Sequence, residues 1–349
     1  MIIIVGAGLS GFLTAYLLQK EGIPFKIVEA RNRVGGRINT IYRENEAPIE
    51  MGATWFNSQH PHLIALLEEL GIERFEQFMD SKVFYQTNPN LPAQIVEVPK
   101  NEPSYRISGG TSTLIDTLLQ KLKPEDIILN QAVNHITING KIITIKAEKV
   151  FQADMVVLAL PPKLWANRIT FEPEISKDLR EIALHTHTWM EDSIKIALTF
   201  AKPFWKEENI PRTLFSNVGP VVEFYDQADT KNSKYALCGF INSAFQKLSK
   251  AERKQLVINQ LKNIFGSSVT EFSHYEECVW SEDSECFQDS VSPLYPHQNN
   301  GNPIFRDTYF DQRLIFSGSE TSSRFPGYME GAVISAKETV RKIVELQSK

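Results

Sequence analysis

The sequence predicts an α/β protein with two domains, the larger of which is built on a parallel sheet. Three observations support this prediction. Residues 2–5, 11–21 and 25–28 alternate as apolar strand, amphipathic helix and apolar strand. Residues 155–160 form a continuous apolar run, typical of a parallel strand that is buried on both faces. The chain of 349 residues is also long enough for two separate cores.

The turn after the first strand contains three glycines, and each meets a different steric demand of a dinucleotide-binding turn. Gly6 allows a tight turn, Gly8 lets backbone approach a pyrophosphate, and Gly11 lets the helix pack on the strand. The amino end of the helix would then face the phosphates. Glu29 lies 18 residues after Gly11, where a carboxylate can accept hydrogen bonds from ribose hydroxyls. The alternative to dinucleotide binding is a glycine turn used only for packing. The motif alone also does not distinguish a site for NAD from a site for FAD.

Composition excludes several classes of protein. The net charge of −5 provides no electrostatic basis for binding nucleic acid or an anionic membrane. Cys238, Cys278 and Cys286 are three cysteines without metal spacing, which predicts reduced thiols and a cytoplasmic location. Met1 leads directly into a strand that glycines interrupt, so we expect neither a signal peptide nor a membrane helix.

Periodicity and turn residues predict the remaining elements. In the first half we expect helices over 62–71 and 112–122 and strands over 95–98, 127–129, 133–138 and 141–147. Further along we expect strands over 193–200, 221–225, 236–241 and 272–280 around one helix over 250–265. This second set predicts a smaller α+β domain with a mixed sheet. A strand over 314–316 and a helix beginning near Gly327 return the chain to the first domain.

The first domain is therefore predicted to be discontinuous. We assign to it residues 1–75, 106–183 and 282–349. The second domain, expected to bind the substrate, takes residues 76–105 and 184–281.

Residues 29–37 continue beyond the acid with two arginines and a double glycine, and they resemble the second signature of the flavin-containing amine oxidases, which include monoamine and polyamine oxidases. Further matching segments follow in order over nearly the whole chain: 50–55, 109–110, 130–133, 158–162, 193–195, 202–205, 318–321 and 327–332. The chain is thus identified as a short, bacterial-type member of this family. The resemblance implies an FAD-binding, Rossmann-like domain of the glutathione-reductase type.

The resemblance also implies which residues hold FAD. Arg31 and Arg37 can offset the pyrophosphate charge through bidentate hydrogen bonds, although a surface ion pair is the alternative for either one alone. Val133 is expected near the adenine, and the helix that starts at Gly327 is expected to face the flavin. The full predicted set is Gly6, Gly8, Gly11, Glu29, Arg31, Gly36, Arg37, Val133, Glu320, Tyr328 and Met329.

Three residues are expected to serve the chemistry. Lys195 lies mid-strand among apolar residues, where burial would lower its pKa, and by resemblance it holds a water near flavin N5 and assists reoxidation by O2. An edge-strand lysine pointing to solvent is the alternative. Tyr328 resembles one wall of an aromatic cage that orients a neutral amine. Trp280 matches a tryptophan near the flavin, with an ordinary core position as the alternative.

The chain departs from the family pattern in two places. Counted from Trp280, the position of a flavin-linking cysteine falls on Asp289 and that of the second cage aromatic on Ser290, while Cys286 lies three positions early. We therefore predict non-covalent FAD and an incomplete cage. Only 53 residues separate Trp55 from Gly109, which predicts a reduced substrate domain and either a more open cavity or one that a partner closes.

Two other groups of residues are assigned no chemistry. The histidine pairs at 60 and 62 and at 185 and 187 have no carboxylate or cysteine at ligand spacing, so we predict no metal site. Glu282, Asp283 and Glu285 are expected to form a solvated acidic loop, with attraction of a cationic amine as the alternative.

These observations predict an FAD-dependent oxidoreductase that oxidises the CH–NH bond of an amine by hydride transfer to flavin N5. O2 would be the acceptor and H2O2 the product. Two alternatives stay open: a flavin-dependent CH–CH desaturase or dehydrogenase with another acceptor, and a non-catalytic flavin-binding interaction protein. The missing cage aromatic favours the desaturase, and Lys195 counts against it.

Overall fold

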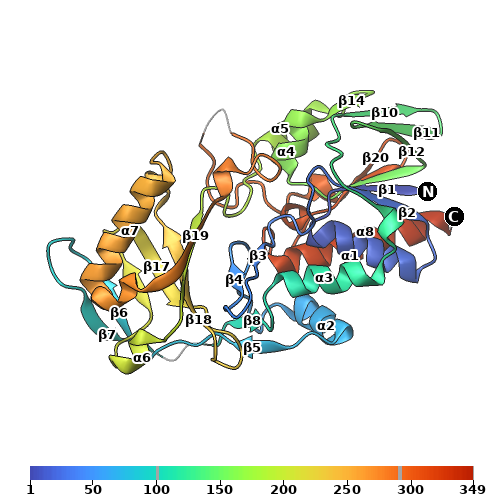
Figure 1. The fold of residues 1–349 in the computed structure, drawn as a ribbon. Helices are drawn as coiled ribbons and strands as arrows, with labels where there is room; N and C mark the ends of the chain where they lie inside the picture. Colours follow the sequence, from blue (N-terminus) through green and yellow to red (C-terminus); the bar gives the residue numbers. More distant parts are fainter. Residues whose placement is uncertain (100–101, 290–292, 349) are drawn as a thin grey trace.

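The computed structural model describes residues 1–99, 102–289 and 293–348, and a six-stranded sheet lies at the centre of its larger half (Figure 1). The strands run in the order β20 (Thr308–Tyr309), β21 (Leu314–Phe316), β13 (Met155–Leu158), β1 (Ile2–Val5), β2 (Phe25–Val28) and β9 (Ile127–Ile128). All neighbours are parallel except β20 and β21. The beginning, middle and end of the chain thus contribute to one sheet, as predicted.

The side chains of β1 alternate between two cores because successive residues of a strand point to opposite faces. Ile2 and Ile4 pack toward the helices α1 (Leu9–Lys20), α2 (Pro61–Leu70), α3 (Ser112–Lys121) and α8 (Met329–Gln347). Ile3 and Val5 pack toward the opposite face. Burial on both faces explains the uninterrupted apolar character of this strand.

A four-stranded sheet and two helices cover that opposite face. The sheet has the order β12 (Val150–Ala153), β11 (Ile142–Lys146), β10 (His135–Asn139) and β14 (Thr170–Glu172), and α4 (Pro162–Arg168) and α5 (Lys177–Leu184) pack beside it. The sequence analysis did not predict β12, β14, α4 or α5. Most of these elements are short, and their shape depends on the core that they close.

The second half of the molecule is a seven-stranded mixed sheet. Its order is β19 (Phe272–Val279), β15 (Ile194–Phe200), β18 (Tyr235–Ile241), β17 (Val221–Asp226), β16 (Leu214–Ser216), β6 (Lys82–Gln86) and β7 (Gln94–Glu97). Neighbours are antiparallel except β16 and β6. The predicted mixed sheet is confirmed, and its strands all fall within the segments assigned to the substrate domain, whose boundaries stay a prediction.

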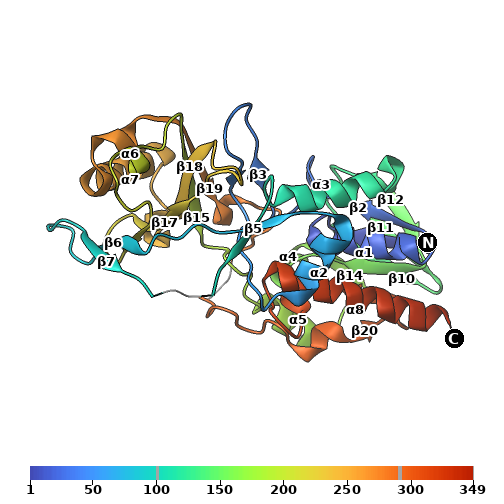
Figure 2. The same cartoon turned by 90° about the horizontal axis from the view of Figure 1, so that it is seen from below.

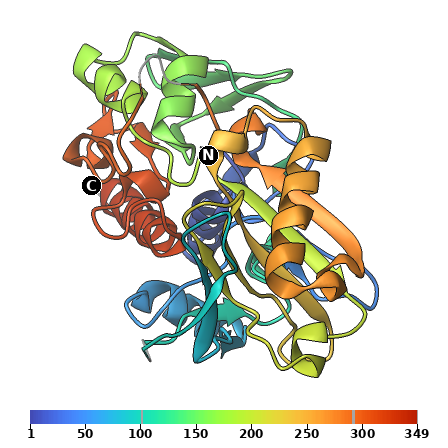
Figure 3. The ribbon, with the colours of Figure 1, turned by 90° about the vertical axis from the view of Figure 1, so that its left-hand side faces the viewer.

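Helix α7 (Lys250–Phe265) covers the face of this sheet that is turned away from the parallel sheet, and it is seen in orange in Figures 1 and 3. The short helix α6 (Phe204–Glu207) follows β15. The paired strands β3 (Thr40–Ile41) with β4 (Ile49–Glu50), and β5 (Arg74–Glu76) with β8 (Tyr105–Ile107), lie between the two halves (Figures 1 and 2). No helix in the described ranges is long and apolar enough to span a membrane.

Two boundaries near the expected site differ by one or two residues from the prediction. Strand β19 ends at Val279, so Trp280 begins a single 3-10 turn instead of closing the strand. Helix α8 begins at Met329, because Gly327 has a φ of +89° and Tyr328 is extended. Trp280 therefore lies just after β19, and Tyr328 lies just before α8.

Candidate active site

A cavity of about 1210 Å³ lies between the two halves of the molecule. One side is formed by the turn after β1 and by the carboxyl ends of the neighbouring parallel strands, where ligands bind in open α/β sheets. The other side is formed by the seven-stranded sheet. All residues predicted to bind the cofactor or serve the chemistry line this cavity, except Gly11, which lies behind the turn.

The glycine turn is shaped partly by protein packing and partly by the cavity. A Cβ atom at Gly6 would lie 2.7 Å from the carbonyl oxygen of Ala159, and one at Gly11 would lie 2.0 Å from that of Gly6. A Cβ atom at Gly8 would meet no atom within 4 Å. Packing therefore requires Gly6 and Gly11, whereas Gly8 leaves space over the backbone that a pyrophosphate can fill.

Alanine at these two glycines should separate folding from cofactor binding. Gly11→Ala should lower the free energy of unfolding by about 1–3 kcal/mol, since the added methyl group overlaps backbone. Gly8→Ala should change it by less than about 1 kcal/mol, yet weaken FAD binding about tenfold or more because the methyl group occupies the cradle. Urea unfolding of the apoprotein and fluorescence titration with FAD measure both quantities. If Gly8→Ala bound FAD as tightly as the wild type, Gly8 would not be part of the FAD-binding surface.

Glu29 is buried at the end of β2 and accepts hydrogen bonds from the backbone N–H groups of Ala7 at 2.7 Å and Arg31 at 3.0 Å. Each carboxylate oxygen accepts only one of these bonds, so each has a lone pair left for another donor. Val133 also lines the cavity. This placement agrees with the predicted contact between Glu29 and a ribose hydroxyl.

Arg31 forms an ion pair with Asp283 and lies 3.1 Å from the sulfur of Cys286. The prediction of a solvated acidic loop is therefore wrong for Asp283, whose side chain is only 23% exposed because the guanidinium of Arg31 holds it in place. Glu285 of the same loop lies 3.3 Å from Arg168. The loop thus anchors the segment after β19 to the dinucleotide-binding signature.

Arg37 connects the two ends of the chain. Its guanidinium lies 2.7 Å from the carboxylate of Glu320, which is 1% exposed, and donates to the hydroxyl of Ser319 at 2.8 Å. Burial opposes the charge on both members of the pair, but their mutual attraction outweighs it, so the pKa of Arg37 is raised and that of Glu320 is lowered. Gly36, with a φ of +58°, brings this segment against Gly8.

Lys195, the second residue of β15, faces the cavity. Its neighbours Ile194 and Ile196 pack toward α7, and strand alternation turns the lysine the other way. Because β15 has β18 on one side and β19 on the other, the edge-strand alternative is excluded. Only 2% of the residue is exposed.

The ammonium of Lys195 donates to the carbonyl oxygen of Gly52 at 2.7 Å and contacts the hydroxyl of Thr54. It also lies 4.9 Å from the ring centre of Trp55. Burial lowers the pKa of Lys195, an effect that the nearby Cys238 and Glu50 offset only in part. The result is a buried amine at the junction of the two halves of the molecule.

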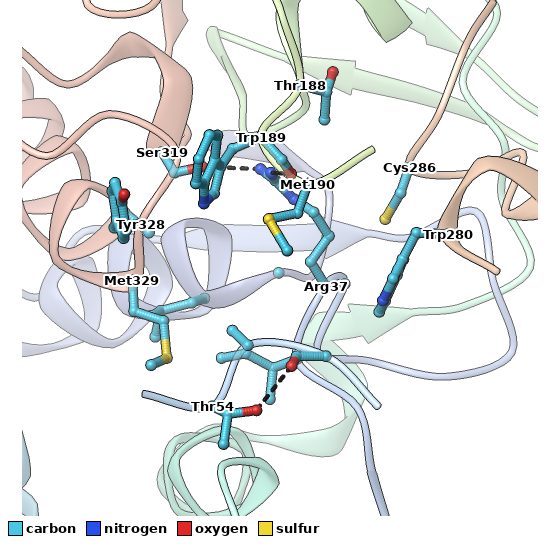
Figure 4. Close-up of a pocket in the computed structure, with 18 of the residues that line it drawn as sticks. Arg37, Thr54, Thr188, Trp189, Met190, Trp280, Cys286, Ser319, Tyr328 and Met329 are labelled. Carbon is cyan, nitrogen blue, oxygen red and sulfur yellow. Dashed lines mark hydrogen bonds between the residues drawn. The ribbon is translucent and has the colours of Figure 1, made fainter. Parts of the chain in front are cut away.

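Aromatic side chains form the remaining walls (Figure 4). The indole N–H of Trp280 donates to the carbonyl oxygen of Met51 at 2.8 Å. Tyr328 is 37% exposed, and its ring centre lies 5.5 Å from that of Trp189 and 6.0 Å from that of His297. Met329 lies beside Tyr328, on the side of the cavity opposite Trp280 in this view.

The sequence analysis missed Trp189. Its indole stacks on His297 at 4.0 Å with an interplanar angle of 19°, and its backbone oxygen accepts from Arg37 at 3.2 Å. Both partners are far away in the sequence, so no local pattern could have singled it out. One histidine of each pair takes part in such packing: the His60 ring meets Phe325 at 4.8 Å, and His187 borders Trp189.

The cavity has a dinucleotide-binding turn on one side and a buried lysine with aromatic residues on the other. This is the arrangement of a flavoprotein oxidoreductase, because cofactor and substrate must meet in one enclosed space. The chain belongs to the family of flavin-containing amine oxidoreductases, whose sequence profile matches residues 9–100 and 91–344. It is an FAD-dependent, amine oxidase-like enzyme. The predicted family, enzyme class and cofactor are confirmed.

Two relatives illustrate the similarity in sequence. A probable flavin-containing monoamine oxidase A of Dictyostelium discoideum is 24% identical over an alignment of 452 residues, which covers 98% of this chain and 97% of the relative. The flavin-containing amine oxidase B of Sus scrofa is 21% identical, with 100% of this chain and 86% of the relative covered. These alignments are longer than this chain, so the relatives contain insertions that it lacks.

Solved structures show the same fold. A putrescine oxidase bound to putrescine superimposes with a TM-score of 0.85 at 21% identity, over 99% of this chain and 98% of the other. Cyclohexylamine oxidase from Brevibacterium oxydans IH-35A superimposes with a TM-score of 0.86 at 19% identity, over 100% and 99%. The predicted two-part FAD-binding fold is confirmed.

Proposed function

We propose that this protein oxidises the CH–NH bond of an amine and uses O2 as the acceptor, with release of H2O2. Bound FAD would accept the hydride at N5 and pass the electrons to O2. The observation that supports this proposal best is Lys195, a buried amine that faces the cavity where the two sheets meet. We also propose a cytoplasmic location, on the basis of the free cysteines Cys238, Cys278 and Cys286.

The ADP portion of FAD is assigned to the first half of the molecule. Amides of the turn at Gly6 to Gly11 and the guanidinium of Arg37 would bind the phosphates, and Glu29 would bind the ribose. The lining supports this orientation, since Arg31, Arg37 and Arg168 all lie on that side of the cavity. The flavin end would then face Lys195.

Lys195, Trp280 and Tyr328 are proposed to serve the reaction. In the described part of the chain, the ammonium uses two of its three N–H bonds for Gly52 and Thr54, so the third can hold a water at the flavin. Tyr328 and Trp280 would orient the neutral amine and exclude bulk water from it.

The absence of a second cage aromatic at Ser290 was the argument for a CH–CH desaturase. The structure weakens this argument. Ser290 lies outside the described residues, but Trp189 provides an aromatic ring 5.5 Å from Tyr328. Lys195 again counts against a desaturase that avoids O2. Amine oxidation is therefore the better-supported reaction.

FAD should be bound without a covalent link. Cys286 lines the cavity, yet its sulfur lies against Arg31, and Asp289 stands where the linking cysteine is expected. Precipitation of the holoenzyme with acid should release all the flavin into the supernatant, as measured by absorbance. Yellow colour that stays in the pellet after washing would contradict the prediction.

The function is tested by mixing the holoenzyme anaerobically with a panel of primary, secondary and polyamines. Bleaching of the flavin by at least one amine, followed by formation of H2O2 on admission of air, is the expected result. Bleaching without H2O2 would favour another acceptor. A flavin that no amine bleaches would support the non-catalytic alternative.

A further inference from the structure

The segment 188–193 leads into β15 and forms part of the cavity wall. It is tightly turned, and the N–H of Glu191 donates to the carbonyl oxygen of Thr188 at 3.1 Å. Met190 has a φ of +62°, in the left-handed region that residues with long side chains rarely adopt. The local sequence does not favour this shape, so contacts with the rest of the molecule have to maintain it.

Trp189, within this segment, contacts three other parts of the molecule. Its indole stacks on His297, and its ring centre lies 5.5 Å from that of Tyr328. Its carbonyl oxygen accepts from Arg37 at 3.2 Å, so Trp189 lies between Tyr328 and Arg37 (Figure 4). A Cβ atom at Gly327 would lie only 2.6 Å from the Cβ atom of Trp189. Because the contact is so close, a shift of the segment changes the place of the indole relative to Tyr328.

A buried ion pair joins this segment to helix α4. The ammonium of Lys163 donates to the two carboxylate oxygens of Glu191 at 2.9 and 2.8 Å. The two side chains are 1% and 10% exposed, and the ring centre of Phe287 lies 5.0 Å from the ammonium. The attraction between opposite charges is stronger where water is excluded, so the pair holds the carboxylate in one place.

Helix α4 is itself fixed to the central sheet. Trp165 of this helix stacks on Phe316 of β21 at 4.6 Å. The segment 188–193 therefore has two anchors in the larger half of the molecule, the carbonyl oxygen of Trp189 and the carboxylate of Glu191. Met190 lies between these anchors, which explains how its unusual backbone conformation is maintained.

A second buried pair, Arg253 with Glu277 at 2.7 Å, provides a contrast. Glu277 is paired in register with Ile196, whose side chain packs toward α7, so this pair lies on the face of the sheet turned away from the cavity. Glu191 instead belongs to the cavity wall. Exchange of a buried ion pair for apolar residues is often neutral for stability, so the geometry that a pair specifies is the better explanation for one beside a cavity.

We infer that Lys163 and Glu191 are positioning residues for amine oxidation, because their ion pair holds Trp189 against Tyr328 in the arrangement that receives the amine. This inference rests on the proposed oxidation of amines. Lys163 is shielded from the cavity by burial, and the carboxylate of Glu191 is bound by Lys163. Both residues therefore act through Trp189 and take no part in the transfer of hydride.

The test measures the two half-reactions of Glu191→Gln separately by stopped flow. The rate of flavin bleaching at saturating amine should fall between about tenfold and a hundredfold, the effect of a small misplacement of reacting groups. The rate of reoxidation by O2 should change less than about twofold, because Lys195 and its contacts are untouched. Lys163→Met removes the other charge and should reproduce this split. A loss shared equally by both half-reactions would overturn the inference.

A double variant shows whether the pair acts through Trp189. Trp189→Leu should slow flavin bleaching about as much as Glu191→Gln does. Addition of Glu191→Gln to Trp189→Leu should then lower the rate by less than about a further twofold, since changes that act through one contact are not additive. Independent, multiplied losses would contradict the inference.

The matched control is Glu277→Gln, which weakens the buried ion pair on the far face of the second sheet. It should lower the free energy of unfolding and leave both half-reactions within about twofold of the wild type. An equal fall in the bleaching rate of Glu191→Gln and Glu277→Gln would show that lost stability is the cause, and would overturn the inference.

Crystal structures of the wild-type and Glu191→Gln holoenzymes separate this inference from the proposed function. The indole of Trp189 should move by about 1 Å or more from its place on His297 in the variant. If no amine bleaches the wild-type flavin, the proposed oxidation fails, and the displacement still supports the positioning of Trp189 by the pair. An indole in the same place in both structures would overturn the inference.

Discussion

Replacement of Lys195 by methionine should slow reoxidation of the flavin by O2 about a hundredfold, the lower range for a positioned proton-transfer group. Methionine has a similar length and is tolerated in a buried site, so the fold should persist. The change removes the amine that lies against Gly52 and Thr54 and with it the water that it is proposed to hold. Stopped-flow mixing of the reduced enzyme with O2 measures the effect.

The reductive half-reaction provides the internal control. Its rate with a good amine should change far less in Lys195→Met, because the hydride passes directly from substrate to cofactor. An oxidative rate equal to that of the wild type would remove Lys195 from the proposed mechanism.

The oxidative rate should also depend on pH. Burial lowers the pKa of Lys195 from its ordinary value of 10.5. The ammonium stabilises negative charge that develops on oxygen, and it is protonated below its pKa. The rate should therefore fall as the pH rises through this lowered pKa, and Lys195→Met should lack that step.

Replacement of Arg37 by methionine should destabilise the protein by about 3–5 kcal/mol, since it leaves a buried carboxylate without its counter-charge. Glu320 is 1% exposed, and Arg37 also joins the segment before α8 to the amino-terminal signature. FAD binding should be lost as well. Urea unfolding of the apoprotein measures the free energy of unfolding without the contribution of the cofactor.

Two further variants show whether the pair causes the loss. Arg37→Met combined with Glu320→Gln should be more stable than Arg37→Met alone, because the amide carries no uncompensated charge. Arg341→Met breaks the exposed pair with Glu345 at 2.7 Å and should change the stability by less than about 1 kcal/mol. An equal loss of stability in Arg37→Met and Arg341→Met would contradict the claim that burial makes the Arg37–Glu320 pair important.

Much of the fold was predictable because its longest elements have local signals. Helix α7 has the predicted bounds, since a capping box at Ser249 and Glu252 begins it and Gly266 follows its last residue. Strand β1 was predictable from four consecutive apolar residues. Strands such as β14 and β16 have three residues each, and their conformation depends on partner strands that no local window contains.

The same distinction between local signals and distant partners applies to the candidate site. The sequence by itself determined the family, the glycine turn with Glu29 and the position of Lys195 within an apolar strand, because steric demands and alternation act between neighbouring residues.

Only the tertiary structure decided the partners of these groups. It paired Arg31 with Asp283, stacked Trp189 on His297 and aligned Lys195 with Phe240 on the neighbouring strand. These contacts join residues far apart in the chain, and the register between strands and the closure of the core set them, which local sequence patterns do not encode.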